Sequence, residues 1–163
     1  MNNNDVLRRV RFIFDFNDTK MMDLFDLGGK PATRAEISDW LKKEDDPAFQ
    51  GISDHLLAVF LSGLIVMKRG KKDGVQPVPE KKLNNNIVFR KLKIALNYRD
   101  EDILDTLDLA GMRISSHELS AFFRHPDQNQ YKPCKDQILR NFLQGLQIKY
   151  HPVSPSDSEN HPY

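Results

Sequence analysis

The chain has 163 residues, of which 39% are hydrophobic and 29% charged, values typical of one globular domain or two small ones. Its 24 lysines and arginines balance 23 aspartates and glutamates, so the overall charge gives no argument for a nucleic-acid or membrane partner. A single cysteine excludes an internal disulfide, and the longest apolar run, residues 56–67, is too short to span a bilayer. We therefore expect a soluble, cytoplasmic protein with no membrane partner.

The chain repeats itself. Shifted by 82 positions, residues 1–69 align without a gap on residues 83–151, and 19 of the 69 aligned pairs are identical. Such internal identity is typical of duplicated structural units. We expect two tandem homologous helical domains at 1–69 and 83–151, related by a pseudo-twofold axis. A linker at 70–82, rich in glycine, proline and lysine, would join them, and a disordered tail would follow at 152–163.

Each copy opens with three asparagines before a helical pattern of apolar residues. One asparagine in each copy suits the N-cap of this helix, because its side chain can accept a hydrogen bond from a free backbone N–H. The other two have two interpretations. In the first, they belong to the preceding turn, because asparagine tolerates turn and left-handed conformations. In the second, their amides form a polar contact surface that pairs with a base edge or a peptide backbone.

The same first helix carries basic residues in both copies: Arg8, Arg9 and Arg11 in one, and Arg90, Lys91 and Lys93 in the other. On a helical wheel, Arg8 and Arg11 lie opposite the apolar face, so we expect their charges to point to solvent. These residues form either an ordinary solvated face or a pair of phosphate-binding faces.

A second helix follows in each copy. Asp18 and Asp100 are its expected N-caps, and Gly29 and Gly111 stand where a left-handed residue would end it. Its acidic residues at helical spacing are explained by a cap and a solvated face, and we expect no metal there.

A capping box marks the expected start of the third helix in each copy: Thr33-x-x-Glu36 in the first and Ser115-x-x-Glu118 in the second. The second and third helices are compatible with a helix-turn-helix topology, but the third carries few side chains that read bases. The last helix of each copy, near 54–68 and 136–150, is the most apolar and would be central, with Asp54 and Asp136 as further caps.

Glycines recur inside the last helix at Gly63 and Gly145, where each costs about 1 kcal/mol of helix propensity relative to alanine. Their recurrence predicts that another helix crosses closely at both positions. No strand-like alternation of useful length occurs, so the fold class is all-α.

Catalytic patterns are absent from the sequence. No histidine has a histidine at the equivalent repeat position, and there is no Gly-x-Ser-x-Gly or glycine-rich phosphate loop. Cys134 aligns with Ile52, which predicts a small buried hydrophobic residue. We therefore expect a non-enzyme without catalytic residues, cofactor or metal, although an active site assembled from distant residues would escape this search.

Several segments carry a resemblance to a known family: the openings NNNDVLR and NNNIVFR, the segment WLKKEDDPAFQG, and the endings FLSGLIVMKRGK and FLQGLQIKY. Together they resemble the YehS-like bacterial proteins, a duplicated family classed as a domain of unknown function. The resemblance covers both repeats and implies a bacterial cytosolic protein with two related helical domains. The family brings no activity, cofactor or catalytic residue to carry over.

We expect a binding or adaptor protein whose partner is a protein. Nucleic acid is the alternative partner, and an enzyme with an unrecognised site between the repeats is the third reading. The oligomeric state is not indicated by the sequence. The candidate contact surface consists of the following side chains: Asn2, Asn3, Arg8, Arg11, Asn84, Asn85, Arg90 and Lys93.

Overall fold

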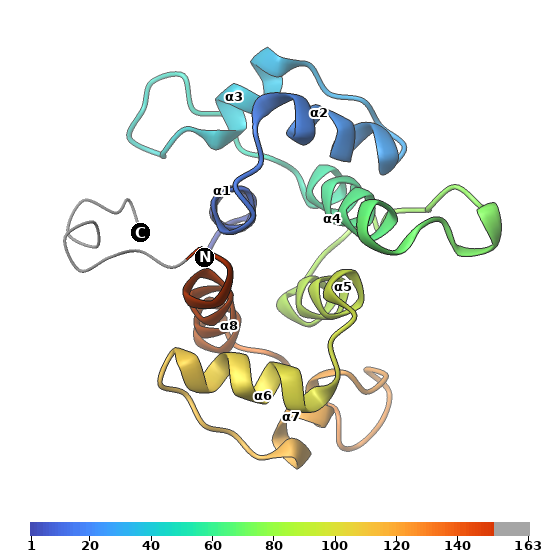
Figure 1. Cartoon of the computed structure of the whole chain (residues 1–163), viewed down its shortest axis with the longest axis vertical. Helices are drawn as coiled ribbons and strands as arrows, with labels where there is room; N and C mark the ends of the chain where they lie inside the picture. Colours follow the sequence, from blue (N-terminus) through green and yellow to red (C-terminus); the bar gives the residue numbers. More distant parts are fainter. Residues whose placement is uncertain (152–163) are drawn as a thin grey trace.

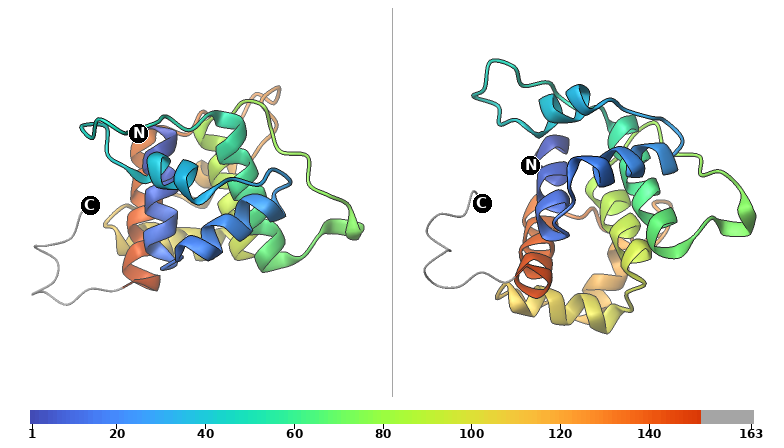
Figure 2. Two further views of the ribbon diagram at one scale, coloured as in Figure 1. Left: turned by 90° about the horizontal axis from the view of Figure 1, so that it is seen from above. Right: turned by 45° about the horizontal axis from the view of Figure 1, so that its top comes forward.

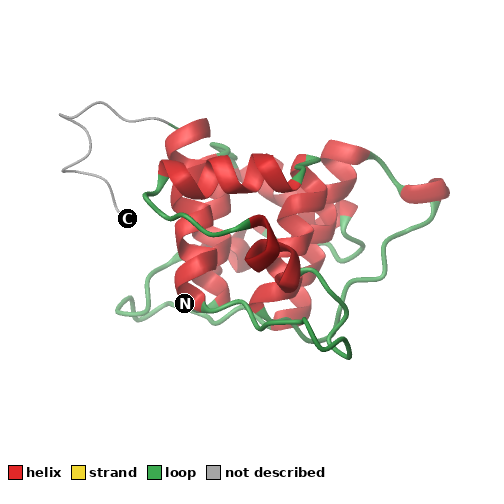
Figure 3. Cartoon of the chain, turned by 90° about the horizontal axis from the view of Figure 1, so that it is seen from below, coloured by secondary structure: helices red, strands yellow, loops and turns green. Residues whose placement is uncertain are grey.

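In a computed structural model, residues 1–151 of the chain are described, and this part contains eight α-helices and one short 3₁₀ turn. Figure 3 shows these helices joined by loops, with no strand in the same range. The expected all-α class is confirmed. The tail expected at 152–163 lies outside the described residues. The elements are α1 (Asn3–Ile13), α2 (Asp18–Leu27), α3 (Arg34–Leu41), α4 (Asp54–Arg69), η1 (Lys72–Gly74), α5 (Asn85–Leu96), α6 (Asp100–Leu109), α7 (Ser116–Phe122) and α8 (Asp136–Tyr150).

The first and last helices of each repeat form the centre of the molecule. Figure 1 shows α1, α4, α5 and α8 nearly end-on, with α1 beside α8 and α4 beside α5. The second and third helices of each repeat, α2 and α3 or α6 and α7, cover the outer sides of this centre (Figures 1 and 2). The two repeats are thus related by the expected pseudo-twofold arrangement, in which α1 corresponds to α5 and α4 to α8.

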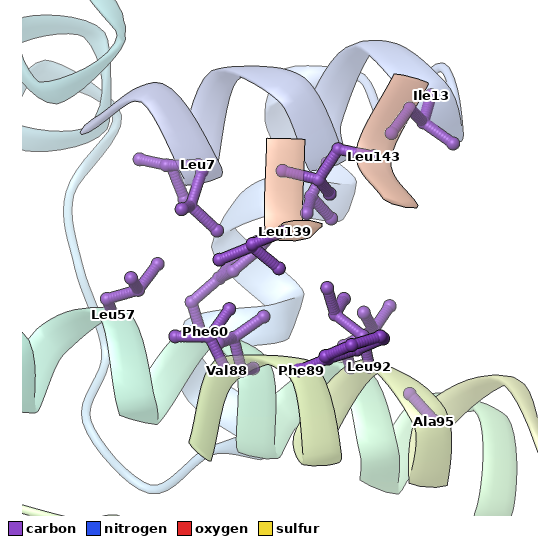
Figure 4. Close-up of a cluster of buried hydrophobic side chains, with 14 of the residues drawn as sticks. Leu7, Ile13, Leu57, Phe60, Val88, Phe89, Leu92, Ala95, Leu139 and Leu143 are labelled. Carbon is purple, nitrogen blue, oxygen red and sulfur yellow. The ribbon is translucent and has the colours of Figure 1, made fainter. Parts of the chain in front are cut away.

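One hydrophobic core runs through both repeats. Figure 4 shows Leu7 of α1 and Phe60 of α4 gathered with Phe89 of α5 and Leu139 of α8, and all four side chains are fully buried. Burying one such side chain contributes about 1.5–3 kcal/mol. The apolar helix faces of each repeat are therefore covered partly by the other repeat.

The glycines of the last helices mark close crossings, as the sequence predicted. A Cβ atom on Gly63 would lie 1.8 Å from the carbonyl oxygen of Leu24 in α2. In the second repeat, a Cβ atom on Gly145 would lie 2.0 Å from the carbonyl oxygen of Thr106 in α6. Both obstacles are backbone atoms, so a side chain cannot be accommodated by a rotamer change.

Several helix ends follow the expected local rules. Both capping boxes are formed, at Thr33 with Glu36 and at Ser115 with Glu118. Helices α2 and α6 are followed by Gly29 (φ 99°) and Gly111 (φ 80°), which take the left-handed conformation that glycine tolerates.

The expected aspartate caps are wrong by one position. The N-caps of α2 and α6 are Asn17 and Arg99, and those of α4 and α8 are Ser53 and Lys135. The four aspartates are instead the first residue of each helix, where a carboxylate still interacts favourably with the helix dipole. The four residues concerned are Asp18, Asp100, Asp54 and Asp136.

The close crossings can be tested by substitution. We expect Gly63→Ala and Gly145→Ala each to lower the free energy of unfolding by about 2 kcal/mol or more, because overpacking against backbone exceeds the helix propensity gained. Gly51→Ala is the control, since a Cβ there meets nothing within 4 Å and the expected change is about 0.5 kcal/mol or less. Urea unfolding measures all three. Wild-type stability of Gly63→Ala would contradict the close crossing.

Candidate functional site

The three asparagines at the start of each repeat have three different structural roles. The first, Asn2 or Asn84, is the N-cap: its side-chain oxygen accepts from the backbone N–H of Asp5 (2.8 Å) or Ile87 (2.9 Å). In the first repeat Asp5 also accepts from the N–H of Asn2 at 3.0 Å, which completes a capping box. The cap expected from the sequence is confirmed.

The third asparagine is buried and joins two distant segments. The amide nitrogen of Asn4 donates to the carbonyl oxygens of Trp40 and Gln50, both at 2.8 Å, and its oxygen accepts from the N–H of Ile52 at 3.1 Å. Asn4 is 3% exposed. Every donor and one acceptor site of the amide is thus used, and the end of α3 is tied to the loop before α4.

The second repeat reproduces this arrangement. Asn86, which is 4% exposed, donates to the carbonyl oxygens of Phe122 (3.0 Å) and Lys132 (2.9 Å) and accepts from the N–H of Cys134 (2.8 Å). We call Asn4 and Asn86 the asparagine clamps.

The second asparagine of each triplet reaches the start of the last helix. Asn3 donates to the carbonyl oxygen of Ile52 (3.2 Å) and to a carboxylate oxygen of Asp54 (2.8 Å). Asn85 donates equivalently to Cys134 (3.0 Å) and Asp136 (2.7 Å). These partners are not the turn before α1 or α5, so the turn interpretation of the extra asparagines is wrong.

The two aspartates in turn reach across to the other repeat. The second oxygen of Asp54 accepts from the backbone N–H of Leu83, at the start of repeat two, at 2.9 Å. The second oxygen of Asp136 accepts from the α-ammonium group of Met1 at 2.8 Å. Met1 and Leu83 are equivalent positions, so each repeat holds the first residue of the other through the same carboxylate.

These hydrogen bonds shift the acidities of both carboxylates. Donation from Asn3, followed by donation from the Leu83 N–H, lowers the pKa of Asp54. The α-ammonium group of Met1, followed by Asn85, lowers the pKa of Asp136. Both carboxylates are therefore held in their charged form by the fold.

The basic residues of the candidate surface are mostly engaged inside the chain. Arg8 donates to the carbonyl oxygen of Lys42 at 2.8 Å and pairs with Asp5, and its side chain is only 13% exposed, so the expectation that it points to solvent is wrong. Arg90 donates to the carbonyl oxygen of Phe123 at 3.4 Å.

Lys93, on the same face of α5, pairs with Asp100 at 2.9 Å and lies 4.4 Å from the ring centre of Phe123. Arg11 stands in the last turn of α1, and its buried Nε makes no hydrogen bond. Binding of a partner by the eight candidate residues stays a prediction.

A cleft that the sequence did not predict lies between the two repeats. It has a volume of about 530 Å³ and opens between α1, the loop after α3 and the first half of α8. Its lining is almost entirely charged: Met1, Asp5, Arg8, Arg9, Lys43, Glu44, Asp45 and Arg140. We call it the α1/α8 cleft.

Some of these charges are already positioned by contacts. Arg9 donates to the side-chain oxygen of Gln144 at 3.1 Å, and Arg140 donates to that of Gln137 at 3.2 Å. Glu44 accepts from the amide of Asn2. The two guanidinium groups come from different repeats, so the cleft exists only when the repeats are assembled.

The face equivalent to this cleft, between α4 and α5, is occupied by the linker 70–82. Figure 2 shows this segment leaving α4, looping outward and returning to α5. On its return, Glu80 pairs with Lys91 of α5 at 2.7 Å, and its carbonyl oxygen lies 2.9 Å from Nδ1 of His55 in α4. A space of about 220 Å³ remains beneath the linker.

Among the described residues, the surroundings of the cysteine, the arrangement of metal-ligating side chains and the length of the helices also bear on function. Cys134 is buried, as expected, and desolvation raises the pKa of its thiol to about 12. Within residues 1–151, no group of three or more His, Cys, Asp or Glu side chains is arranged to hold a metal ion. In the same range, no helix combines the length and the apolar content needed to cross a bilayer.

Comparison with known proteins places the chain in a family. The model of a family described as a protein of unknown function, DUF1456, matches residues 3–70 and again residues 85–151. The chain belongs to this family. The uncharacterized protein YehS of Escherichia coli (strain K12) is 42% identical over 152 residues, which cover 93% of this chain and 97% of that protein. No solved structure matches.

These matches confirm the resemblance drawn from the asparagine openings and the helix endings. The two segments that match DUF1456 coincide with the two repeats and leave out residues 71–84, which include most of the linker. The family description assigns no activity.

The aspartates that join the repeats predict a pH dependence of stability. An aspartate whose pKa falls on folding stabilises the protein above its unfolded pKa, near 3.9, and this contribution is lost as the pH falls through the lower folded pKa. We therefore expect Asp54→Asn to be destabilising at pH 6 and to approach wild type as the pH falls below about 4.

Urea unfolding between pH 6 and pH 2.5 measures this difference, with Asp23→Asn, an exposed position in α2, as the control that stays near wild type throughout. A difference between Asp54→Asn and wild type that is constant over this range would contradict the role given to the carboxylate.

Proposed function

We propose that this chain is a non-enzymatic adaptor that binds a partner protein in the α1/α8 cleft. The observation that carries the proposal is the position of the cleft: charged side chains of both repeats meet there, while the equivalent face is partly covered by the chain's own linker. Among residues 1–151, the linker covers one inter-repeat face and no segment covers the other, and such a concave surface is a natural place for a ligand.

The charges of the cleft favour a protein over a nucleic acid. Nucleic-acid grooves present mainly cations, because each phosphate carries a negative charge. Here three carboxylates line the same cleft as four cationic side chains and the α-ammonium group of Met1, so both signs of charge are present: Asp5, Glu44 and Asp45 beside Arg8, Arg9, Lys43 and Arg140. A peptide surface can offer both signs of charge at suitable spacing, whereas a polyphosphate backbone cannot.

The proposal of a non-enzymatic role is supported by the location of the perturbed groups. Among the described residues, the pKa values of Asp54, Asp136, Cys134, Lys149 and Tyr150 are shifted, and none of these residues lines the cleft. Each shift has a structural cause. Lys149, for example, donates to the hydroxyl of Tyr98 at 2.9 Å, and this contact raises its pKa.

Photo-crosslinking in living cells tests the proposal. The full chain would carry p-benzoylphenylalanine in place of Lys43, an exposed residue of the cleft, or in place of His125, its equivalent in the second repeat and outside the cleft. Expression in Escherichia coli, the source of the 42% identical relative, supplies a related cellular environment. We expect a discrete protein adduct from position 43 and none from position 125.

Two results would overturn the proposal. Equal yields from positions 43 and 125 would show that the cleft is not a preferred contact. An adduct that disappears on nuclease treatment would favour the nucleic-acid alternative, in which Arg8, Arg11, Arg90 and Lys93 contact phosphates.

A further inference from the structure

The linker shows what kind of ligand the inter-repeat faces of this fold accept. On the α4/α5 face, an extended segment with prolines at 77 and 79 returns along α4 and places the carboxylate of Glu80 on Nζ of Lys91 at 2.7 Å. The side chain of Lys91 is only 10% exposed, whereas that of Glu80 is 37% exposed, so the linker places a partly solvated carboxylate on a buried ammonium group. The face therefore binds an acidic residue of an extended peptide.

The residues of the α1/α8 cleft can be compared with the equivalent residues of the α4/α5 face. Shifting by 82 positions converts Lys91 into Arg9 and Ala58 into Arg140, and both arginines line the cleft. The place that corresponds to the Glu80 carboxylate is thus bordered by two guanidinium groups instead of one ammonium group. A guanidinium group can hold a carboxylate through two parallel hydrogen bonds, so the α1/α8 face is better suited to an acidic side chain than the α4/α5 face.

A second difference concerns the buried surface of α8. Gln147 is 6% exposed, and its side-chain oxygen makes no hydrogen bond. Its equivalent in α4 is Ile65, which borders the space beneath the linker. A buried acceptor without a donor is costly, but Gln147 does not line the α1/α8 cleft, so this difference is separate from the cleft.

We propose that the α1/α8 cleft binds an extended segment of a partner protein that carries one acidic anchor, a glutamate or aspartate whose side chain lies between Arg9 and Arg140. The proposal rests on the proposed adaptor function and adds the chemistry of the ligand. The carboxylates of Asp5, Glu44 and Asp45 select against a continuous run of acids, so the segment combines an acidic anchor with neutral or basic neighbours, as the linker itself does around Glu80.

The direct test uses the linker sequence as the probe. A synthetic peptide that copies residues 71–82, KKDGVQPVPEKK, would be titrated into the full chain with arginine side-chain NMR signals as the readout. We expect saturable shifts at Arg9 and Arg140. The same peptide with glutamine in place of its glutamate should bind about tenfold more weakly, because a charge-assisted pair is lost.

Matched variants separate the cleft from the rest of the surface. Arg140→Ala makes the cleft residue identical to its equivalent on the other face, Ala58. We expect this substitution to weaken peptide binding about tenfold. Arg9→Lys copies Lys91 and should retain binding, whereas Arg9→Gln should lose it. Thermal unfolding of each variant shows whether the fold is kept, and Arg140, which is exposed, is the variant least able to disturb it.

Three results would overturn this inference: no saturable shifts at millimolar peptide, shifts confined to arginines outside the cleft such as Arg90, or unchanged binding by Arg140→Ala. None of them would remove a protein adduct at position 43. Conversely, peptide binding without such an adduct would contradict the adaptor function and leave the ligand chemistry standing.

Discussion

The buried amide of the asparagine clamp is the constraint on which the rest of this fold depends. A primary amide in the interior must have its donors and acceptor satisfied, because each group left without a partner costs about 1–3 kcal/mol. Asn4 meets this demand only when the end of α3 and the loop before α4 lie at the tip of α1. That loop then delivers Asp54 to the first residue of the second repeat. The placement of this loop, and through it the contact between Asp54 and the second repeat, thus depends on one buried side chain, and Asn86 makes the equivalent contacts in the second repeat.

Pseudo-symmetry gives the molecule two equivalent inter-repeat faces, and the connection between the repeats necessarily breaks the equivalence. The linker must run from the end of α4 to the start of α5, so it covers one face and places Glu80 on Lys91. The other face is lined by charged residues at equivalent positions, including an arginine where the covered face has Ala58. Surfaces that differ between otherwise equivalent positions are where a duplicated protein can acquire a specific partner.

Much of the fold could be read from the sequence because its signals are local. The capping boxes, the glycines after α2 and α6, and the glycines at the helix crossings depend on residues a few positions apart or on recurrence after 82 positions. The errors concern partners far along the chain. Asn4 contacts Trp40 and Ile52, which are 36 and 48 residues away, and no local pattern links an asparagine to such carbonyl and amide groups. The helical wheel predicts a solvent-exposed Arg8, but the carbonyl oxygen of Lys42 accepts a hydrogen bond from its guanidinium group.

The α1/α8 cleft was missed for a related reason, since its lining comes from the first residues, the loop after α3 and the start of α8. The contrast between Arg140 and Ala58 was visible in the aligned repeats. This contrast points to a site only because the α1/α8 and α4/α5 pairs are equivalent and the linker covers the second pair.

The most direct test of this account is the unfolding free energy of Asn4→Ala compared with Asn2→Ala. Loss of the N-cap at Asn2 should cost about 1 kcal/mol. Loss of the clamp should cost about 3 kcal/mol or more, because three backbone groups lose their partner at a buried site. The Ile52 amide should also lose its protection from hydrogen exchange in the clamp variant. A clamp variant no less stable than the cap variant, with Ile52 still protected, would contradict the central place given to this asparagine.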